Sequence, residues 1–259
     1  MTIKNRFQLG MKRAIRVLFL LVVTNSVFAQ KEISKQSLVW YSIFTTLEFS
    51  ERWYFQNEIQ ERVFINPTAQ HQFIVRSHIH RLLGKTGWEA SIGGCVFFQN
   101  PNDPNAVVKL TVPEVRPHLE FGYKQKLDKV TFDHRFRVEA RFFHNVNESR
   151  TELEDGFEYS NYRFRYKLQA TIPLFKMDEN RALKFNVYDE LFINAGNKIV
   201  TNVFDQNRFF VGLNYDIFKN LNFEVGYLNW FQQKPDGTFF DRDIVRFTVF
   251  HKLNLKNKK

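Results

Sequence analysis

Several features that define common classes of exported or membrane protein are scarce in this sequence. Cysteine occurs once in 259 residues, as Cys95, which excludes an intrachain disulfide framework. After residue 29 no run approaches 18 apolar residues, which excludes membrane-spanning helices. Beyond the same point, no segment of ten or more residues shows the 3.6-residue period of an amphipathic helix. The remaining signal is β-strand alternation in a chain that contains 30 phenylalanines and is 25% charged.

The first 29 residues have the pattern of a cleaved secretory signal peptide. Residues 1–16 contain five basic residues and no acidic residue, and a short apolar run follows at residues 17–23. Val27-Phe28-Ala29 then fits a small-residue cleavage site. The apolar run is too short to span a bilayer as a helix, which needs about 20 residues. We therefore expect residues 30–259 to form one exported domain.

Removal of this signal halves the excess of positive charge. The full chain has 37 basic and 27 acidic residues, whereas residues 30–259 have 32 basic and 27 acidic ones, so the net charge falls from +10 to +5. The remaining basic residues alternate with acidic ones along the chain and do not cluster. This distribution is evidence against a nucleic-acid partner.

The clearest strand pattern lies at residues 131–143. One set of alternate positions is largely apolar: Phe132, His134, Phe136, Val138, Ala140 and Phe142. The other set is largely ionic: Thr131, Asp133, Arg135, Arg137, Glu139 and Arg141. Side chains alternate across a strand, so this segment is predicted to have an apolar face and a charged face. In a closed membrane barrel, the apolar face contacts lipid and the charged face lines the lumen.

Similar alternation recurs along the chain between turn sequences, which predicts an all-β fold with hairpin connections. The predicted strands cover residues 38–49, 52–64, 72–83, 88–98, 115–127, 131–143, 157–172, 183–193, 208–217, 221–231 and 243–255. Short and longer connections alternate in the second half, as they do in outer-membrane barrels. Bacterial single-chain barrels normally have an even number of strands. We therefore expect a single antiparallel up-and-down transmembrane β-barrel of about 12 strands, with a further strand at residues 106–112, and 10 strands as the alternative.

A soluble periplasmic sandwich or lipocalin-like barrel would also alternate, but two features favour a membrane barrel. Large aromatic residues near the strand ends suit interfacial girdles: Trp53, Trp88, Tyr123, Tyr162, Tyr215, Tyr227 and Trp230. The polar faces also carry many like charges, which a lumen can offset with carboxylates from other strands. The expected location is the outer membrane of a Gram-negative bacterium. The expected partners there are outer-membrane lipid and the barrel-assembly machinery.

The main candidate for function is a network of charged residues in the lumen. It comprises Glu58, Arg62, Glu114, Arg116, Arg135, Arg137, Glu139, Arg141, Arg163, Arg165, Glu190 and Arg208. Arginine and carboxylate side chains form planar, bidentate pairs. In one interpretation the network is a salt-bridged plug that holds a narrow barrel in shape. In the other, its excess of arginine attracts small anionic solutes into a pore.

Catalytic and metal chemistry have weaker signals. His78 and His80 lie two apart on one strand face and could both reach one metal ion, but no third ligand follows at a fixed spacing. Ser77 is next to His78, but adjacent side chains on a strand point to opposite faces, so this histidine could not activate the serine as a nucleophile. We therefore expect no metal, no cofactor and no catalytic residue. A lipid-modifying enzyme, or a scaffold or receptor that acts through its loops, remains the alternative.

Seven short motifs occur in an order that resembles a known family. They are Glu114-Val115-Arg116, residues 134–142, Arg163-Phe164-Arg165-Tyr166, residues 189–194, Asp205-Gln206-Asn207-Arg208, residues 212–215 and Gly226-Tyr227-Leu228. Together they resemble the uncharacterised bacterial outer-membrane β-barrel family known as domain of unknown function 2490, common in Bacteroidetes. The resemblance covers residues 37–255 and implies an outer-membrane barrel. It implies no activity, substrate or catalytic residue.

Overall fold

The computed structural model describes residues 32–199 and 203–256. The signal peptide expected at residues 1–29 lies outside these described residues. Within them, no helix is long and apolar enough to cross a membrane.

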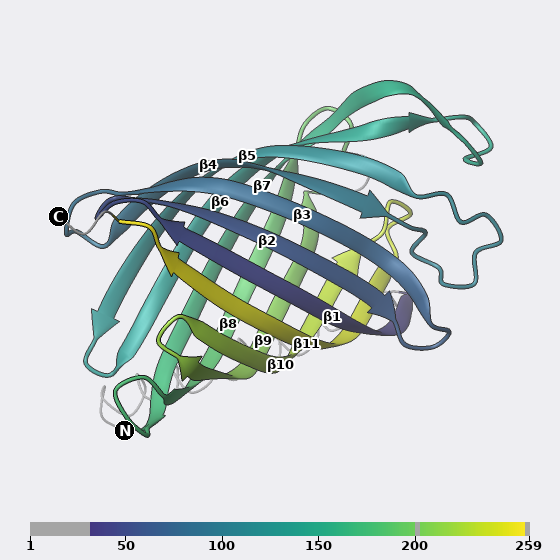
Figure 1. The fold of residues 1–259 in the computed structure, drawn as a ribbon. Helices are drawn as coiled ribbons and strands as arrows, with labels where there is room; N and C mark the ends of the chain where they lie inside the picture. Colours follow the sequence, from purple (N-terminus) through teal and green to yellow (C-terminus); the bar gives the residue numbers. More distant parts are fainter. Residues whose placement is uncertain (1–31, 200–202, 257–259) are drawn as a thin grey trace, which may run out of the picture. The chain divides into compact units, whose positions relative to one another are not determined.

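The described chain is built from long β-strands. They are β1 (Ile33–Glu48), β2 (Trp53–Phe64), β3 (Ala69–Leu82), β4 (Trp88–Gln99), β5 (Val112–Leu127), β6 (Val130–Val146), β7 (Leu153–Lys176), β8 (Ala182–Ala195), β9 (Phe204–Phe218), β10 (Leu221–Gln233) and β11 (Phe239–Asn254). Each strand pairs antiparallel with the next one in the sequence, and β1 pairs with β11 to close the barrel (Figure 1). The predicted all-β barrel with hairpin connections is therefore confirmed.

The closing pair of strands is parallel. The described residues form eleven strands where the sequence predicted about twelve. In an up-and-down chain, an odd strand number makes the first and last strands run in the same direction. Accordingly, β1 and β11 lie side by side and pair parallel from Ile33 with Phe239 to Glu48 with Asn254 (Figure 1).

The further strand expected at residues 106–112 does not form. These residues belong to the connection between β4 and β5, and β5 begins only at Val112. The pairing of β4 with β5 ends with Gln99 opposite Val112, so residues 106–111 have no strand of this hairpin left to pair with. Val107, the second residue of the expected strand, is 99% exposed.

The two ends of the barrel differ in the length of their connections. One end carries the turns at residues 49–52, 83–87, 128–129, 177–181 and 219–220, and is called the short-turn end. The other carries residues 65–68, 100–111, 147–152, 196–203 and 234–238, and is called the long-loop end. The connections left between the predicted strands, at residues 144–156 and 173–182, are shorter than expected. The β6–β7 pairing continues past a register shift near Val146, and the β7–β8 pairing continues past one near Pro173.

The barrel wall has apolar side chains on its outer face and charged side chains on its inner face, which is the reverse of the arrangement in a soluble protein. On β6, Phe136 is 49% exposed while the neighbouring Arg137 is 2% exposed. The same reversal holds at Leu119, which faces outward on β5, and at Glu114, which is fully buried. A soluble monomer rarely exposes so continuous an apolar surface. The alternation predicted at residues 131–143 is confirmed, with the charged face inside.

The aromatic residues predicted to form girdles divide between the two faces. Trp53, Trp88 and Tyr162 are exposed on the outside, as predicted. Trp230 is different, because it is 2% exposed and lies in the lumen. The alternation itself accounts for this difference, since Tyr227 and Trp230 are three residues apart and must point to opposite faces.

Candidate functional site in the lumen

The barrel brings all twelve predicted network residues into its lumen. Each lies at an inward position of its strand, and the alternation of β6 alone contributes Arg135, Arg137, Glu139 and Arg141. Eight of the twelve join one connected set of ion pairs, as the distances below show. The other four are held by separate partners.

Glu139 is the centre of the connected set. Its carboxylate lies 2.5 Å from an Nη atom of Arg165, 3.5 Å from one of Arg137 and 3.9 Å from one of Arg116. Arg137 and Arg165 stand directly opposite each other on β6 and β7, so their charges would repel without this carboxylate. Glu139 therefore offsets three guanidinium groups in a buried position.

Glu114 closes the set toward the long-loop end. Arg116 donates to both carboxylate oxygens at 2.6 Å, which is a bidentate pair. Arg141 donates to the same oxygens at 2.5 and 3.2 Å. One fully buried carboxylate is thus fixed by two arginines, from β5 and β6.

Glu190 and Glu120 extend the set toward the short-turn end. Arg165 donates to Glu190 at 2.9 and 2.7 Å, and Arg135 donates to the same oxygen at 2.5 Å. Arg137 donates to Glu120 through its Nε atom at 2.6 Å, and Arg135 lies 3.7 Å from the same oxygen. The set therefore joins β5, β6, β7 and β8.

The remaining four residues have other partners. Glu58 pairs with Arg76, and Arg163 lies 3.1 Å from Asp205. Arg62 and Arg208 instead lie over aromatic rings, as described below.

Several residues of the site lie outside the predicted network of twelve. Glu120 completes the connected set, and Arg76, Asp205, Glu224, Arg242 and Arg246 also lie inside. Each of them occupies one of the alternate strand positions that face the lumen, so the alternation in the sequence could have identified them. Their pairing could not be predicted, because it depends on which strands meet.

A ring of contacts crosses the lumen between the two ends. On one side, Arg62 lies over the ring of Trp40 at 3.7 Å, and Trp40 contacts Trp230 with ring centroids 5.6 Å apart. We call the full ring the partition; its members in order are Trp40, Arg62, Phe97, Arg116, Glu139, Arg165, Phe192, Arg208 and Trp230. Six of its nine links place an arginine over an aromatic ring, two are ion pairs with Glu139, and one joins the two tryptophans.

The partition is tightly packed. Its longest links are 6.0 Å, from Arg62 to Phe97, and 5.6 Å, between the two tryptophans. All its members except Arg208 are buried. Buried side chains leave little surface for water to touch, although four members also line the short-turn cavity described next: Trp40, Arg62, Arg165 and Arg208.

A cavity lies on each side of the partition. The long-loop cavity has a volume of about 630 Å³ and is lined by basic residues that include Arg141, Arg163 and Lys234. The short-turn cavity has a volume of about 440 Å³, and its lining includes Glu120 and Lys167. Among the described residues, the two linings share no side chain.

The position of the partition is visible along single strands. On β6, Arg141 lines the long-loop cavity, Arg135 and Arg137 line the short-turn cavity, and Glu139 lies between them. On β10, Gln232 lines the first cavity and Glu224 the second, with Trp230 between. On both strands, therefore, a residue of the partition lies between the residues that line the two cavities.

Comparisons with known proteins agree with the barrel. A family model described as "Protein of unknown function (DUF2490)" matches residues 38–241. A structure of the porin NanC, from a rhombohedral crystal form, is similar at 10% sequence identity with a TM-score of 0.50, over 83% of this chain and 97% of that one. LpxR from Salmonella typhimurium is similar at 9% identity with a TM-score of 0.46, over 80% and 86% of the two chains. No curated protein matches the sequence. At such low identity, the similarity to NanC supports the fold alone.

Proposed function

The chain belongs to the DUF2490 family, whose function is unknown, and from this premise we propose that it is an outer-membrane β-barrel with a closed lumen. Its role in this proposal is structural: it forms a stable barrel in the membrane and holds small solutes without a continuous water-filled pore. The partition is the observation that carries the proposal. The membrane location is supported by the apolar outer face, where Phe136 and Leu119 are exposed.

The salt-bridged interpretation of the lumen is favoured over an open pore for two reasons. Glu139 and Glu114 are each fixed by more than one arginine, so much of the arginine charge is already paired. The partition residues on either side of these carboxylates are also buried. A conducting filter instead needs charged groups that contact a water path and release ions easily.

Capture or slow permeation of small anions is a second candidate. The twelve predicted residues comprise eight arginines and four glutamates, which leaves an excess of positive charge. Arg163 and Lys234 line the long-loop cavity, whose volume of about 630 Å³ would admit a small anionic solute. In this version the solute is bound at the long-loop end, and the partition limits its passage.

We propose a non-catalytic role, with outer-membrane lipid and the barrel-assembly machinery as partners. Arg62 and Arg137 illustrate the reason, because both guanidinium groups are held by hydrogen bonds to neighbouring side chains in the lumen. A lipid-modifying enzyme, or a loop-mediated scaffold or receptor, would need groups outside this network. The long connections at residues 100–111 and 147–152 would serve the scaffold role.

Conductance across a planar bilayer tests this proposal. We expect refolded residues 30–259 to insert and to give no discrete conductance steps with small monovalent salts. Heat-modifiable migration on a gel would show in parallel that the barrel is folded. Stable steps that carry anions better than cations would contradict the closed lumen and favour the second candidate.

A further inference from the structure

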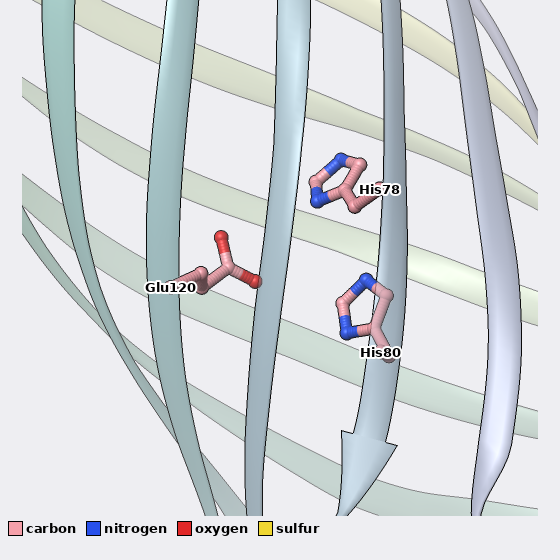
Figure 2. A group of neighbouring side chains, drawn as sticks. All are labelled: His78, His80 and Glu120. Carbon is pink, nitrogen blue, oxygen red and sulfur yellow. The ribbon is translucent and has the colours of Figure 1, made fainter.

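Three ligating side chains meet in the short-turn half of the lumen. His78 and His80 come from β3, and Glu120 comes from β5, with β4 between the two strands (Figure 2). One potential ligand atom from each residue lies within 4.8 Å of the others, and all three residues are buried. In Figure 2 both imidazole rings extend from β3 toward the carboxylate of Glu120.

We propose that His78, His80 and Glu120 bind one divalent transition-metal ion of the zinc type. Two imidazoles and one carboxylate form a ligand set that zinc uses where a fourth position stays open. His78 and Glu120 also line the short-turn cavity, so the open position faces a space that can hold water or a small anion. The inference rests on these contacts and is independent of whether the lumen conducts.

The burial of His80 is a second, separate observation. His80 is 3% exposed, yet within the described part of the chain neither of its ring nitrogens has a hydrogen-bond partner. Leaving a buried polar group unpartnered costs about 1–3 kcal/mol. The ring is held by stacking on Tyr54, with centroids 4.3 Å apart. A bound metal ion would give one of these nitrogens its missing partner.

The surrounding groups leave suitable nitrogen atoms for the ion. A carboxylate oxygen of Glu89 lies 3.8 Å from Nδ1 of His80, which is too long for a hydrogen bond but places an acceptor behind the ring if Nε2 binds the ion. Glu89 is fixed in turn because the Tyr54 hydroxyl donates to it at 2.8 Å. A carboxylate behind a ligating histidine is the usual arrangement around protein-bound zinc.

His78 is oriented by a second imidazole. Nδ1 of His118 lies 3.2 Å from the carbonyl oxygen of Arg116 and can donate to it, which makes Nε2 of His118 an acceptor. That Nε2 lies 3.5 Å from Nδ1 of His78. If His78 donates from Nδ1, its Nε2 lone pair is available to the metal.

The strand between the ligands provides the necessary space. Gly93 on β4 pairs with His78 on one side and His118 on the other. A Cβ atom at this position would lie 3.0 Å from Nε2 of His118 and 2.3 Å from the Ser77 carbonyl oxygen. Glycine therefore lets the imidazole rings meet over β4.

The local charge selects among metal ions. Arg137 and Arg135 both approach Oε2 of Glu120, which leaves Oε1 as the better ligand atom and lowers the net negative charge. Hard ions such as Ca²⁺ prefer sites with several carboxylates. Neutral imidazoles suit zinc and neighbouring transition ions.

Equilibrium dialysis of the refolded barrel with Zn²⁺ alone, followed by metal analysis, tests the proposal. We expect one Zn²⁺ per chain, and we expect His80→Ala and His78→Ala each to weaken binding by more than about 100-fold, beyond the effect of losing an outer-shell partner. His134→Ala is the matched control, because His134 is a half-buried histidine of β6 that contacts Tyr166 away from the cluster. This control should bind as the unchanged protein does.

A spectroscopic measurement keeps the test independent of folding defects. Co²⁺ in the same site should give visible absorption bands typical of low coordination number, and His80→Ala should lose them while the folded barrel still shows heat-modifiable migration. No stoichiometric Zn²⁺ binding by the unchanged protein would overturn the proposal. Equal binding by the His80→Ala, His78→Ala and His134→Ala variants would overturn it as well.

Discussion

Replacing Glu139 by glutamine is expected to lower the free energy of unfolding of the barrel by about 3–5 kcal/mol. The carboxylate lies within 4 Å of Arg165, Arg137 and Arg116, and glutamine keeps its size while removing its charge. Three buried guanidinium groups would then lack their shared counter-charge. Urea unfolding in lipid vesicles, followed by tryptophan fluorescence, measures the change.

Glu154→Gln is the control for this variant. It makes the same chemical change at an exposed carboxylate near the start of β7. Its free energy of unfolding should stay within about 0.5 kcal/mol of the unchanged protein, as is usual for surface substitutions. Equal effects of the two substitutions would show that the central carboxylate is not needed to balance the arginines.

Opening one side of the partition should convert the closed barrel into a conducting one. In a triple variant, Trp40, Arg62 and Trp230 are each replaced by alanine, which removes three buried side chains from β1, β2 and β10. The two cavities would then join where Trp40 and Trp230 now make contact. We expect discrete conductance steps in a planar bilayer, where the unchanged protein gives none.

The matched control changes a residue adjacent to each of these three on the same strand. Tyr41, Glu61 and Phe231 have the opposite parity, so their side chains point away from the lumen. Their replacement by alanine should leave the bilayer without steps, and heat-modifiable migration should confirm that both triple variants are folded. If the lumen-facing variant is folded and still silent, the partition is not the barrier.

The faces of the strands could be predicted from the sequence because alternation is a local property. Residues 131–143 have a charged face and an apolar face, and both were assigned correctly without knowledge of any partner strand. The twelve residues of the predicted network were chosen by the same rule. The family resemblance over residues 37–255 was likewise confirmed by the match over residues 38–241.

The contacts inside the lumen could not be predicted in the same way. Arg135 and Glu190 are 55 residues apart, and their contact depends on the registers of β6, β7 and β8 together. Trp40 and Trp230 meet only because the barrel closes through β1, β11 and β10. We predicted about twelve strands because bacterial barrels normally have an even number. The described barrel has eleven strands, and it closes because β1 pairs parallel with β11.

The most direct measurement of the barrel's orientation toward lipid is site-directed spin labelling in lipid vesicles. Single cysteines would be placed at Phe136 and Leu213, which are exposed on the outside, and at Gln56 and Gln169, which line the short-turn cavity. Cys95 would first be replaced by alanine to remove the native thiol. Labels at the first two sites should collide with lipid-soluble oxygen far more often than labels at the last two. Equal oxygen accessibility at all four sites, or the reverse order, would contradict a membrane barrel with an apolar exterior and a charged interior.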